Sequence, residues 1–560
     1  MKPTKLLIIG GVAGGASAAT RARRLCEEAE IVVVERGPFV SFANCGLPYY
    51  LGGEIASEDA LRIHTPESLR ASFNLDVRVR TEATAINRKA RTVTLRDLAR
   101  GREGEESYDA LILAPGAAPL RPPIPGIERE GHFVVRDIPD VQQIDAWIRT
   151  HDARRAVIVG GGYIGLEMAE QFARRGLEIA IGEMLPQVMA PLDPEMAAWL
   201  HQELRANGVD LHLGDGVAGF EPAGPGEGAA ASVVVLQSGA RLPADVVILG
   251  LGVRPEVALA RDAGLEIGER RGIRVDTGMR TSDAAIWAVG DAVEIRHAVT
   301  GEWTLMALAG PANHQGRIAA DNIFGRESRY RGAVGTAVLR LFSLTAACTG
   351  ANEATLQRAG IEYHTLHVHP QDHAGYYPGA ERLDLKLLYA PDEGRLLGAQ
   401  AVGKSGVDKR IDVLATAIRA GMSVRDLVDL ELAYSPPYGA AKDPVNLAGM
   451  AASNQLDGLV EKTRWSDVTR LQEQGALLLD VRTAEEWEAG RLPGAVHIPL
   501  AELRSRLAEL PAEQEIVAYC GSGHRSYNAC RLLEQRGHRC RNLSGGYRTW
   551  RTATAGNSEG

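Results

Sequence analysis

Two of the six cysteines stand in sequence contexts that suit thiol chemistry. Cys45 lies in the segment SFANCGLPYY, and Cys520 begins the segment CGSGHRS between an apolar run and a helix-like one. A cysteine reacts as its thiolate, which nearby positive charge or a helix N-terminus favours. An isolated cysteine is more often a small buried apolar side chain, so the surrounding motif has to decide. The sequence has neither a CxxC metal pair nor a dense disulfide framework, and we predict one or two working thiols and no metal site.

One glycine-rich segment predicts a site for NAD. It reads GGGYIG, a full GxGxxG pattern, between the strand-like AVIVG and a helix-like stretch. Such glycines let the backbone approach a pyrophosphate at a helix N-terminus. Glu183 ends the next strand, where an acid binds a ribose 2′-hydroxyl, and its charge repels a 2′-phosphate, so we expect NADH rather than NADPH. A glycine-rich turn in an unrelated α/β fold is the alternative. The predicted NAD-binding residues are Gly160, Gly162, Tyr163, Ile164, Gly165, Glu183 and Gly252.

An earlier glycine-rich segment, Gly10–Gly15, predicts a site for FAD. Val12 replaces the middle glycine, but Glu35 supplies the ribose partner at the end of VVVE. The later segments LILAPG and TSDAAIWAVGDA resemble those of flavoproteins with two dinucleotide sites, and the second delivers Asp291 toward the ribityl chain. The predicted FAD-binding residues are Gly10, Ala13, Gly14, Gly15, Glu35, Arg36, Ser41, Asn44, Ala114, Pro115, Gly116, Gly290 and Asp291.

Residues 1 to about 450 resemble the CoA-disulfide reductase branch of the pyridine nucleotide–disulfide oxidoreductases. In that branch a single cysteine in SFANCxLPY cycles between a thiol and a mixed disulfide with CoA. The resemblance implies that Cys45 is the redox nucleophile, has a low pKa and receives electrons from NADH through FAD. Related NADH oxidases and peroxidases share the scaffold but form a sulfenic acid on this cysteine. Relatives with a CxxxxC pair have a second cysteine where this chain has Tyr50, so an internal disulfide is excluded.

The same resemblance implies a CoA site and a homodimer. Tyr376 in YYPG and Tyr434 in AYSPPY would come from the partner subunit to act near the cysteine as acids or hydrogen-bond donors. Isolated tyrosines would more often be packing residues, and the RARR cluster could equally be a solvated helix face. The implied CoA contacts are Ser17, Arg21, Arg24, Ser41, Asn44, Asn313 and Lys442.

The C-terminal segment LLLDVRTAEEWEAGRLPGAVHIPL resembles the rhodanese signature. In the loop from Cys520 to Ser526, backbone N–H groups and a helix N-terminus would stabilise a thiolate or persulfide, and Arg525 would add positive charge. The Cys-x4-Arg spacing is one residue shorter than the Cys-x5-Arg of related phosphatases, which favours sulfane sulfur as the substrate. A catalytically dead regulatory rhodanese is the alternative, although such domains usually lack the cysteine. We predict that Cys530 and Cys540 are not catalytic.

A chain of 560 residues is too long for one hydrophobic core. We predict an α/β protein with two Rossmann-like domains for FAD and NAD, an α+β dimerisation domain and a C-terminal α/β rhodanese domain. The predicted boundaries are 1–116 for the first part of the FAD-binding domain, 117–246 for the NAD-binding domain with its Rossmann core from about 154, 247–328 for the second part of the FAD-binding domain, 329–450 for the dimerisation domain, 451–462 for a linker and 463–560 for the rhodanese domain.

Composition limits the partners. The net charge of -9 argues against nucleic acid or an anionic membrane surface, and no apolar run reaches the roughly 18 residues of a membrane span. Lys2 and Lys5 before LLIIGGVAGGASAA resemble a secretory signal, but its cleavage would remove the first nucleotide loop. We therefore expect a cytoplasmic enzyme that acts on small sulfur compounds.

Several functions fit these motifs. The first is an NADH-dependent reductase of CoA-persulfide or polysulfide at Cys45, with Cys520 relaying sulfane sulfur. The second is a CoA-disulfide reductase that maintains a thiol pool, and an NADH oxidase is possible if oxygen reaches the flavin. A sulfur-sensing binding protein is a different class, but it would have no use for two dinucleotide sites. The fused carrier domain favours the first function, because sulfane sulfur has no role in reducing a simple disulfide.

Overall fold

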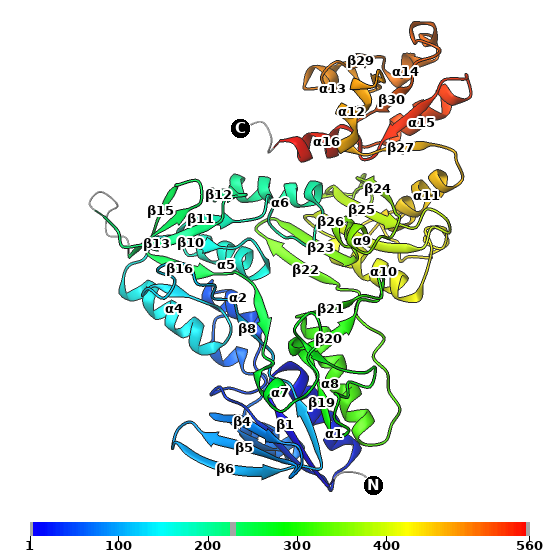
Figure 1. Cartoon of the computed structure of the whole chain (residues 1–560). Helices are drawn as coiled ribbons and strands as arrows, with labels where there is room; N and C mark the ends of the chain where they lie inside the picture. The colour runs from blue at the N-terminus through cyan, green and yellow to red at the C-terminus, as the bar shows by residue number, and fades with distance from the viewer. Residues whose placement is uncertain (1–3, 225–230, 556–560) are drawn as a thin grey trace. The chain divides into compact units, whose positions relative to one another are not determined.

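The computed structural model describes residues 4–224 and 231–555 and divides into two compact units (Figure 1). The first unit contains 1–186 and 208–333, and the second contains 187–207 and 334–560. Residues 1–3 and 556–560, at the ends of the first and last predicted domains, and 225–230, in the predicted NAD-binding domain, lie outside the described residues. Among the described residues, no helix combines the length and the apolar character that a membrane crossing requires.

The first unit contains a five-stranded parallel sheet made from the apolar runs that flank the first glycine loop. Runs such as LLII are buried along almost their whole length, which is typical of parallel strands covered on both faces. Helix α1 (Ala13–Leu25) lies against α8 (Ala309–Ile323), and a side chain on Gly316 would collide with the Gly14 carbonyl. In spatial order the strands are β19 (Ile286–Ala288), β7 (Ala110–Leu113), β1 (Lys5–Ile9), β2 (Glu30–Val34) and β3 (Asp76–Arg78).

A second parallel sheet repeats this plan around the second glycine loop. Helix α5 (Tyr163–Arg174) follows the loop, and α4 (Ile138–Thr150) precedes the first strand of the motif. In spatial order the strands are β12 (Asp210–Leu213), β11 (Glu178–Glu183), β10 (Arg155–Val159), β16 (Val246–Leu249) and β9 (His132–Phe133). The predicted boundary at residue 246 therefore falls at the start of β16, which belongs to this sheet.

Smaller elements complete the first unit. Two antiparallel sheets have three strands each: β4 (Thr81–Asn87), β5 (Thr92–Asp97) and β6 (Arg102–Ser107) form one, and β13 (Val217–Glu221), β14 (Ser232–Leu236) and β15 (Arg241–Ala244) form the other. Strand β8 (Ala117–Pro119) pairs with β17 (Val253–Pro255). Strand β20 (Val293–Arg296) pairs with β21 (Trp303–Leu305) on one side and, in parallel, with β18 (Ile273–Arg274) on the other. The remaining helices are α2 (Leu47–Leu51), α3 (Pro66–Phe73) and α7 (Ala258–Asp262).

The second unit begins with an antiparallel sheet from the predicted dimerisation domain. Helix α6 (Pro194–Ala206), which we expected within the NAD-binding domain, belongs to this unit and packs on the sheet. In spatial order the strands are β22 (Ala337–Leu341), β23 (Leu344–Gly350), β26 (Leu396–Gly403), β25 (Leu383–Tyr389) and β24 (His364–Val368). The other helices are α9 (Glu353–Arg358), α10 (Val407–Ala420) and α11 (Pro444–Leu456).

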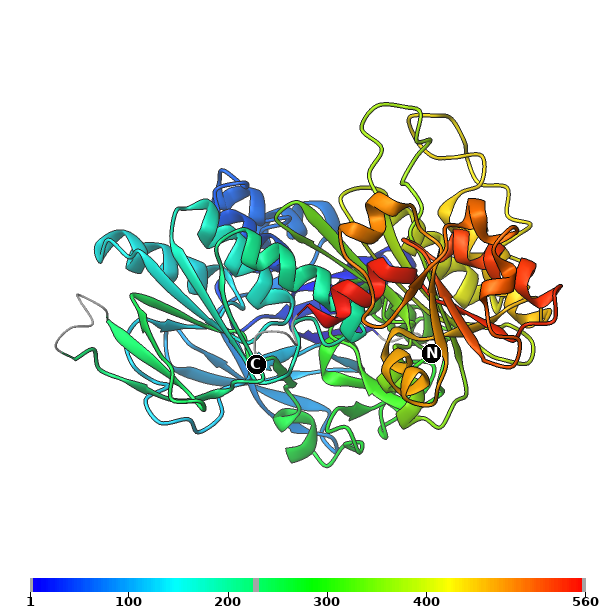
Figure 2. The same ribbon diagram turned by 90° about the horizontal axis from the view of Figure 1, so that it is seen from above.

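A five-stranded parallel sheet with helices forms the end of the chain (orange to red in Figure 1). The segment between the two parts is shorter than the linker expected at 451–462, because α11 extends to Leu456 and the first strand of this sheet, β27, begins at Glu461. In spatial order the strands are β27 (Glu461–Thr463), β31 (Cys540–Leu543), β30 (Ile516–Tyr519), β28 (Leu477–Asp480) and β29 (Val496–His497). The helices are α12 (Val468–Glu473), α13 (Ala484–Glu488), α14 (Leu500–Leu503), α15 (His524–Glu534) and α16 (Gly546–Thr554). Helix α16 lies beside α6 (Figures 1 and 2).

A fully buried lysine holds the second unit together. The ammonium of Lys386 on β25 forms ion pairs with Asp193, Glu195 and Glu353. These three carboxylates lie close enough together to resemble a metal site, but the Lys386 ammonium occupies the position that a metal ion would take. The carboxylates raise the pKa of Lys386 against the opposing effect of burial, and Lys386 keeps the pKa of Glu195 low. The cluster fixes α6 and α9 to the sheet.

We predict that Lys386→Met lowers the free energy of unfolding of the second unit by about 3–5 kcal/mol, because it leaves buried carboxylates without their counter-ion. Denaturant titration followed by circular dichroism measures this change. Lys404→Met is the matched control, since its ion pair with Glu381 is exposed and should contribute less than about 1 kcal/mol. Equal effects of the two substitutions would contradict the assigned role of the cluster.

Candidate active site

Both glycine loops have the geometry of dinucleotide sites. Gly10 has a φ of +98° and Gly160 a φ of +104°, values that disfavour any side chain. A Cβ on Gly10 would lie 2.0 Å from the Ala114 carbonyl oxygen, and one on Gly160 would lie 2.4 Å from that of Gly250. A Cβ on Gly162 would meet no protein atom within 4 Å, so this backbone is open to a ligand.

The two predicted ribose acids occupy equivalent positions. Glu35 accepts hydrogen bonds from the backbone N–H groups of Gly11 and Gly37, at 2.9 and 2.8 Å. Glu183 accepts from those of Gly161 and Leu185, at 2.6 and 2.7 Å. Each carboxylate is thus held beside its glycine loop, where the ribose of a dinucleotide would lie.

The imperfect first motif has a structural explanation. Val12 is the residue before α1, and its φ of -100° lies outside the left-handed region that favours glycine, so the turn itself does not require a glycine. Ala13 then begins the helix, with Gly14 and Gly15 buried behind it.

The remaining predicted FAD residues gather at the ends of the same sheet. Ala114, Pro115 and Gly116 follow β7, and a Cβ on Gly116 would meet no protein atom within 4 Å. The Gly290 N–H donates to Gln315 at 2.7 Å, which orients the turn that carries Asp291. Burial raises the pKa of Asp291. These open glycines and positioned acids fit FAD at the first loop and NAD at the second.

The other predicted cofactor residues have these places. Tyr163, Ile164 and Gly165 form the first turn of α5, Gly252 precedes β17, Ser41 has a φ of 49°, and Arg36 pairs with Glu256 at 3.1 Å.

Cys45 lies in a short 3-10 turn, Asn44–Gly46, before α2 and is exposed. Protein atoms packed around the sulfur partly remove it from water, which raises the pKa of the Cys45 thiol, and the carboxylates of Glu167 and Asp291 raise that pKa further. The expected low pKa is therefore not produced by the protein groups around the thiol. The sequence motifs did not lead us to predict Glu167 as a site residue. It stands one turn into α5, and its carboxylate accepts a hydrogen bond from the Tyr49 hydroxyl at 3.2 Å. Its place just after the GxGxxG loop was the available signal.

The predicted CoA contacts are only partly free for a ligand. Ser17 donates a hydrogen bond to Asn313, and Arg21 pairs with Asp321 at 2.6 Å. Arg24 is exposed, with its guanidinium 5.4 Å from the centre of the Phe73 ring. Of the three remaining residues, Asn44 in the first unit and Lys442 in the second are also exposed, and Ser41 is half-buried.

The two predicted tyrosines are neighbours in the second unit. The Tyr376 and Tyr434 hydroxyls lie 3.0 Å apart although 58 residues separate them in sequence. The residues are 76% and 49% exposed, so both hydroxyls are presented at the surface. The hydrogen bond raises the pKa of Tyr376, which keeps that hydroxyl protonated at neutral pH.

The loop of Cys520 directs hydrogen-bond donors at the sulfur. The buried Cys520 Sγ accepts from the Gly523 N–H at 3.2 Å, and the Ser526 hydroxyl, whose single proton is shared with Asn542 Oδ1 at 2.7 Å, lies 3.4 Å from the sulfur. Asn542 orients this loop by donating to the Gly523 carbonyl at 3.0 Å. Such donors favour a thiolate or persulfide sulfur.

Arg525 does not supply an uncompensated positive charge. Its guanidinium forms two hydrogen bonds with Glu486, at 2.6 and 2.7 Å, and the pair lowers the pKa of Glu486 to about 2. Bonding to Glu486 raises the pKa of Arg525, and interaction with Cys520 raises it further, so the expected positive charge lies beside the sulfur but is shared with an acid from α13. Cys530 and Cys540 lie with their sulfur atoms 3.0 Å apart in the buried core.

Helix α16 connects the Cys520 loop to the dimerisation sheet. At its N-terminus, the backbone N–H groups of Tyr547 and Arg548 donate to the carbonyls of Cys520 and Gly521, at 2.7 and 3.1 Å. The Arg548 side chain also binds Asp384 on β25 at 2.7 Å. The loop is therefore held by a helix that the sheet anchors.

Comparisons with known proteins agree with this architecture. The profile of the pyridine nucleotide-disulphide oxidoreductases matches residues 4–316, that of their dimerisation domain matches 337–444, and that of rhodanese-like domains matches 465–553. The structure of reduced Bacillus anthracis CoADR-RHD is 46% identical, with a TM-score of 0.96 over 99% of both chains. An NAD-dependent persulfide reductase from A. fulgidus is 39% identical, with a TM-score of 0.90 over 98% of this chain and 100% of that one. A curated relative named NADH oxidase, from Methanocaldococcus jannaschii, is 34% identical over 455 residues, which are 81% of this chain and 99% of that protein.

We predict that Glu167→Gln lowers the pKa of the Cys45 thiol, because it removes a negative charge that opposes the thiolate. The rate of Cys45 alkylation by iodoacetamide at pH 7 should rise by roughly two- to tenfold, because a larger fraction of the thiol is then ionised. Mass spectrometry of the FAD-loaded protein follows this reaction across pH. Glu178→Gln, at an exposed acid on β11, is the control and should leave the profile unchanged. An unchanged profile for Glu167→Gln would rule out this influence.

We predict that NADH is preferred over NADPH by at least about tenfold in kcat/KM. The fixed carboxylate of Glu183 would meet a 2′-phosphate at a cost above about 1.4 kcal/mol. Steady-state rates with each nucleotide test this, and Glu183→Ser should reduce the preference. Equal use of both nucleotides by the unmodified protein would mean that a basic side chain reaches the phosphate.

Proposed function

The chain belongs to the pyridine nucleotide-disulphide oxidoreductase family, and we propose that it is an FAD-dependent reductase that uses NADH to reduce CoA-persulfide and polysulfide at Cys45. The observation that carries the proposal is the fusion of two dinucleotide loops to a rhodanese-like domain in which Cys520 is retained and its sulfur accepts a hydrogen bond from the Gly523 N–H. A carrier of sulfane sulfur is useful to a persulfide reductase and has no role in reducing a simple disulfide.

The reaction at Cys45 follows from thiol chemistry. The Cys45 thiolate attacks the CoA sulfur of CoA–S–S–H, which gives the mixed disulfide Cys45–S–S–CoA and releases HS⁻. Two electrons and one proton then restore the thiolate and release CoA–SH. FAD held at the first glycine loop would supply these electrons from NADH. The sum is CoA–S–S–H + NADH + H⁺ → CoA–SH + H₂S + NAD⁺.

The tyrosine pair supports a homodimeric form of this site. Tyr376 and Tyr434 present adjacent hydroxyls at the surface, and the matched dimerisation domain gives a means of bringing them to the cysteine of a second copy. There they would donate the proton that the leaving sulfur requires.

Cys520 serves as the relay in this proposal. Its thiolate takes the outer sulfur of a persulfide R–S–S–H, which releases R–S⁻ and leaves Cys520–S–S–H. The thiolate of CoA then removes that sulfur, which restores the Cys520 thiolate and forms CoA–S–S–H for reduction at Cys45. Helix α16 anchors the Cys520 loop to the dimerisation sheet. Because CoA would carry the sulfur from Cys520 to Cys45, the relay does not require the rhodanese-like domain to move.

Two related activities are expected from the same scaffold. Reduction of CoA-disulfide needs only Cys45, FAD and NADH, so we expect it as a second activity. The relative named NADH oxidase favours oxygen as another acceptor. Turnover with CoA-persulfide, polysulfide, CoA-disulfide and oxygen, compared at equal NADH, ranks these activities.

We predict that Cys45→Ser and Cys520→Ser separate the two steps. Cys45→Ser should keep FAD and its reduction by NADH but abolish disulfide and persulfide turnover, because the mixed disulfide cannot form. Cys520→Ser should slow polysulfide reduction and leave CoA-disulfide reduction nearly intact. NADH consumption and sulfide release measure both.

The control is Cys26→Ser, at the end of α1, which should change neither activity. Persulfide turnover by Cys45→Ser would remove Cys45 from the mechanism. If Cys520→Ser slowed both substrates equally, the relay would be wrong and the domain structural.

A further inference from the structure

A small polar pocket lies between β24 and β27, at the junction of the dimerisation and rhodanese-like parts of the second unit. Its volume of about 60 Å³ is several times the roughly 10–15 Å³ that one water requires. The lining residues are His364, Thr365, Gln455, Lys462, Thr463 and Arg464. None of them takes part in the sites of Cys45 and Cys520 described above.

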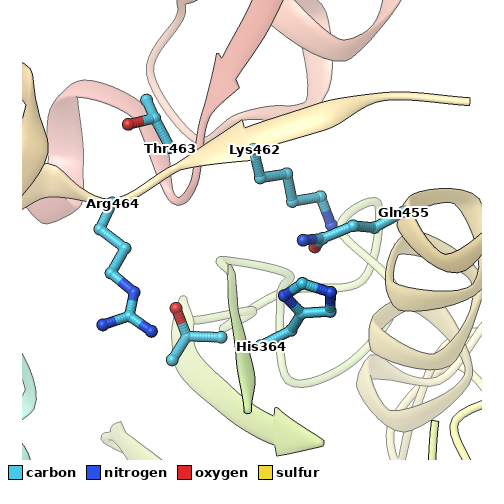
Figure 3. Close-up of a pocket in the computed structure, with 6 residues that line it drawn as sticks. His364, Gln455, Lys462, Thr463 and Arg464 are labelled. Atoms are coloured by element: carbon cyan, nitrogen blue, oxygen red, sulfur yellow. The ribbon is translucent and has the colours of Figure 1, made fainter. Parts of the chain in front are cut away.

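Hydrogen-bond donors from three elements meet at this pocket. Figure 3 shows Lys462 on β27, Gln455 on α11 and His364 on β24 with their polar ends directed toward one another. The Lys462 ammonium donates to the Ala451 carbonyl at 2.7 Å. Gln455 accepts from the Tyr389 hydroxyl at 2.8 Å through its amide oxygen, which leaves its NH₂ group as the end that faces the pocket.

The pocket carries positive charge that its neighbours do not fully compensate. Arg464 is paired with Glu353 at 3.0 Å, but among the described residues no carboxylate forms an ion pair with Lys462. Burial lowers the pKa of Lys462 to about 7. Burial also lowers the pKa of His364, and the charges of Arg464 and Lys462 lower it further. A ligand with negative charge would reverse these penalties.

We propose that this pocket binds a small oxyanion of the sulfate or phosphate type, held by Lys462, Gln455 and His364. A cation would meet the cationic side chains of Lys462 and Arg464, and a nucleotide would exceed the volume. The anion would accept from groups on both sides of the junction and so connect β24 to β27. It would act as an ionic bridge that steadies the rhodanese-like part against the dimerisation sheet.

Calorimetric titration of the FAD-loaded full chain with sodium sulfate tests the proposal. Sulfate keeps its two charges from pH 6 to 9, so pH dependence reports on the protein alone. At constant ionic strength maintained with sodium chloride, we expect one sulfate per chain. The affinity should fall by up to about tenfold for each pH unit above about 7, as Lys462 loses its proton, and proton uptake should accompany binding at pH 8.

Two variants remove the site in different ways. Lys462→Met should abolish binding, and Gln455→Glu should do so with almost no change of shape, because a carboxylate replaces the amide donor. Lys404→Met, at an exposed lysine, is the control and should bind as the unmodified protein does.

Competition by thiosulfate or by phosphate identifies which oxyanion the pocket prefers. If the unmodified protein shows no saturable sulfate binding, if that binding is independent of pH, or if Gln455→Glu binds equally well, the pocket holds only water and the proposal is overturned.

Discussion

The buried ammonium of Lys386 is the constraint on which the second unit depends. A charge moved from water into a protein interior costs several kcal/mol unless partners surround it. Here Asp193 and Glu195 come from the start of α6 and Glu353 comes from α9, so the ammonium is stable only when both helices are assembled against β25. Helix α6, inserted in sequence between strands of the NAD-binding sheet, is thereby committed to the dimerisation sheet.

The same cluster extends to the rhodanese-like part. Glu195 also binds His367 on β24 at 2.9 Å, and the other ring nitrogen of His367 lies 3.2 Å from the Ser544 hydroxyl. The next inward-facing residue, His369, contacts Asp384 and the Thr549 hydroxyl of α16. Two neighbouring sets of buried hydrogen bonds, one reaching Ser544 and one reaching α16, thus connect the dimerisation sheet to the part of the chain that holds the Cys520 loop. Buried polar networks of this kind are stable only when every member is satisfied, which fixes one arrangement of the two parts.

The electrostatics of the two cysteines differ. Cys45 has acidic neighbours, Glu167 and Asp291, that disfavour its thiolate. The Cys520 sulfur instead accepts a hydrogen bond from the backbone of its own loop. Cys45 therefore depends on the cofactor and substrate that complete its site.

The sequence by itself determined the order of domains, the two dinucleotide loops and both candidate thiols, because each depends on a local pattern of glycines, apolar runs and a few fixed residues. Tertiary structure decided what long-range contacts control: the place of α6 in the second unit, the pairing of Arg525 with Glu486 and the meeting of Tyr376 with Tyr434. It also placed Glu167 where it raises the pKa of Cys45. No local pattern encodes these contacts, since burial and the distance between charges from separate segments exist only once the chain is folded.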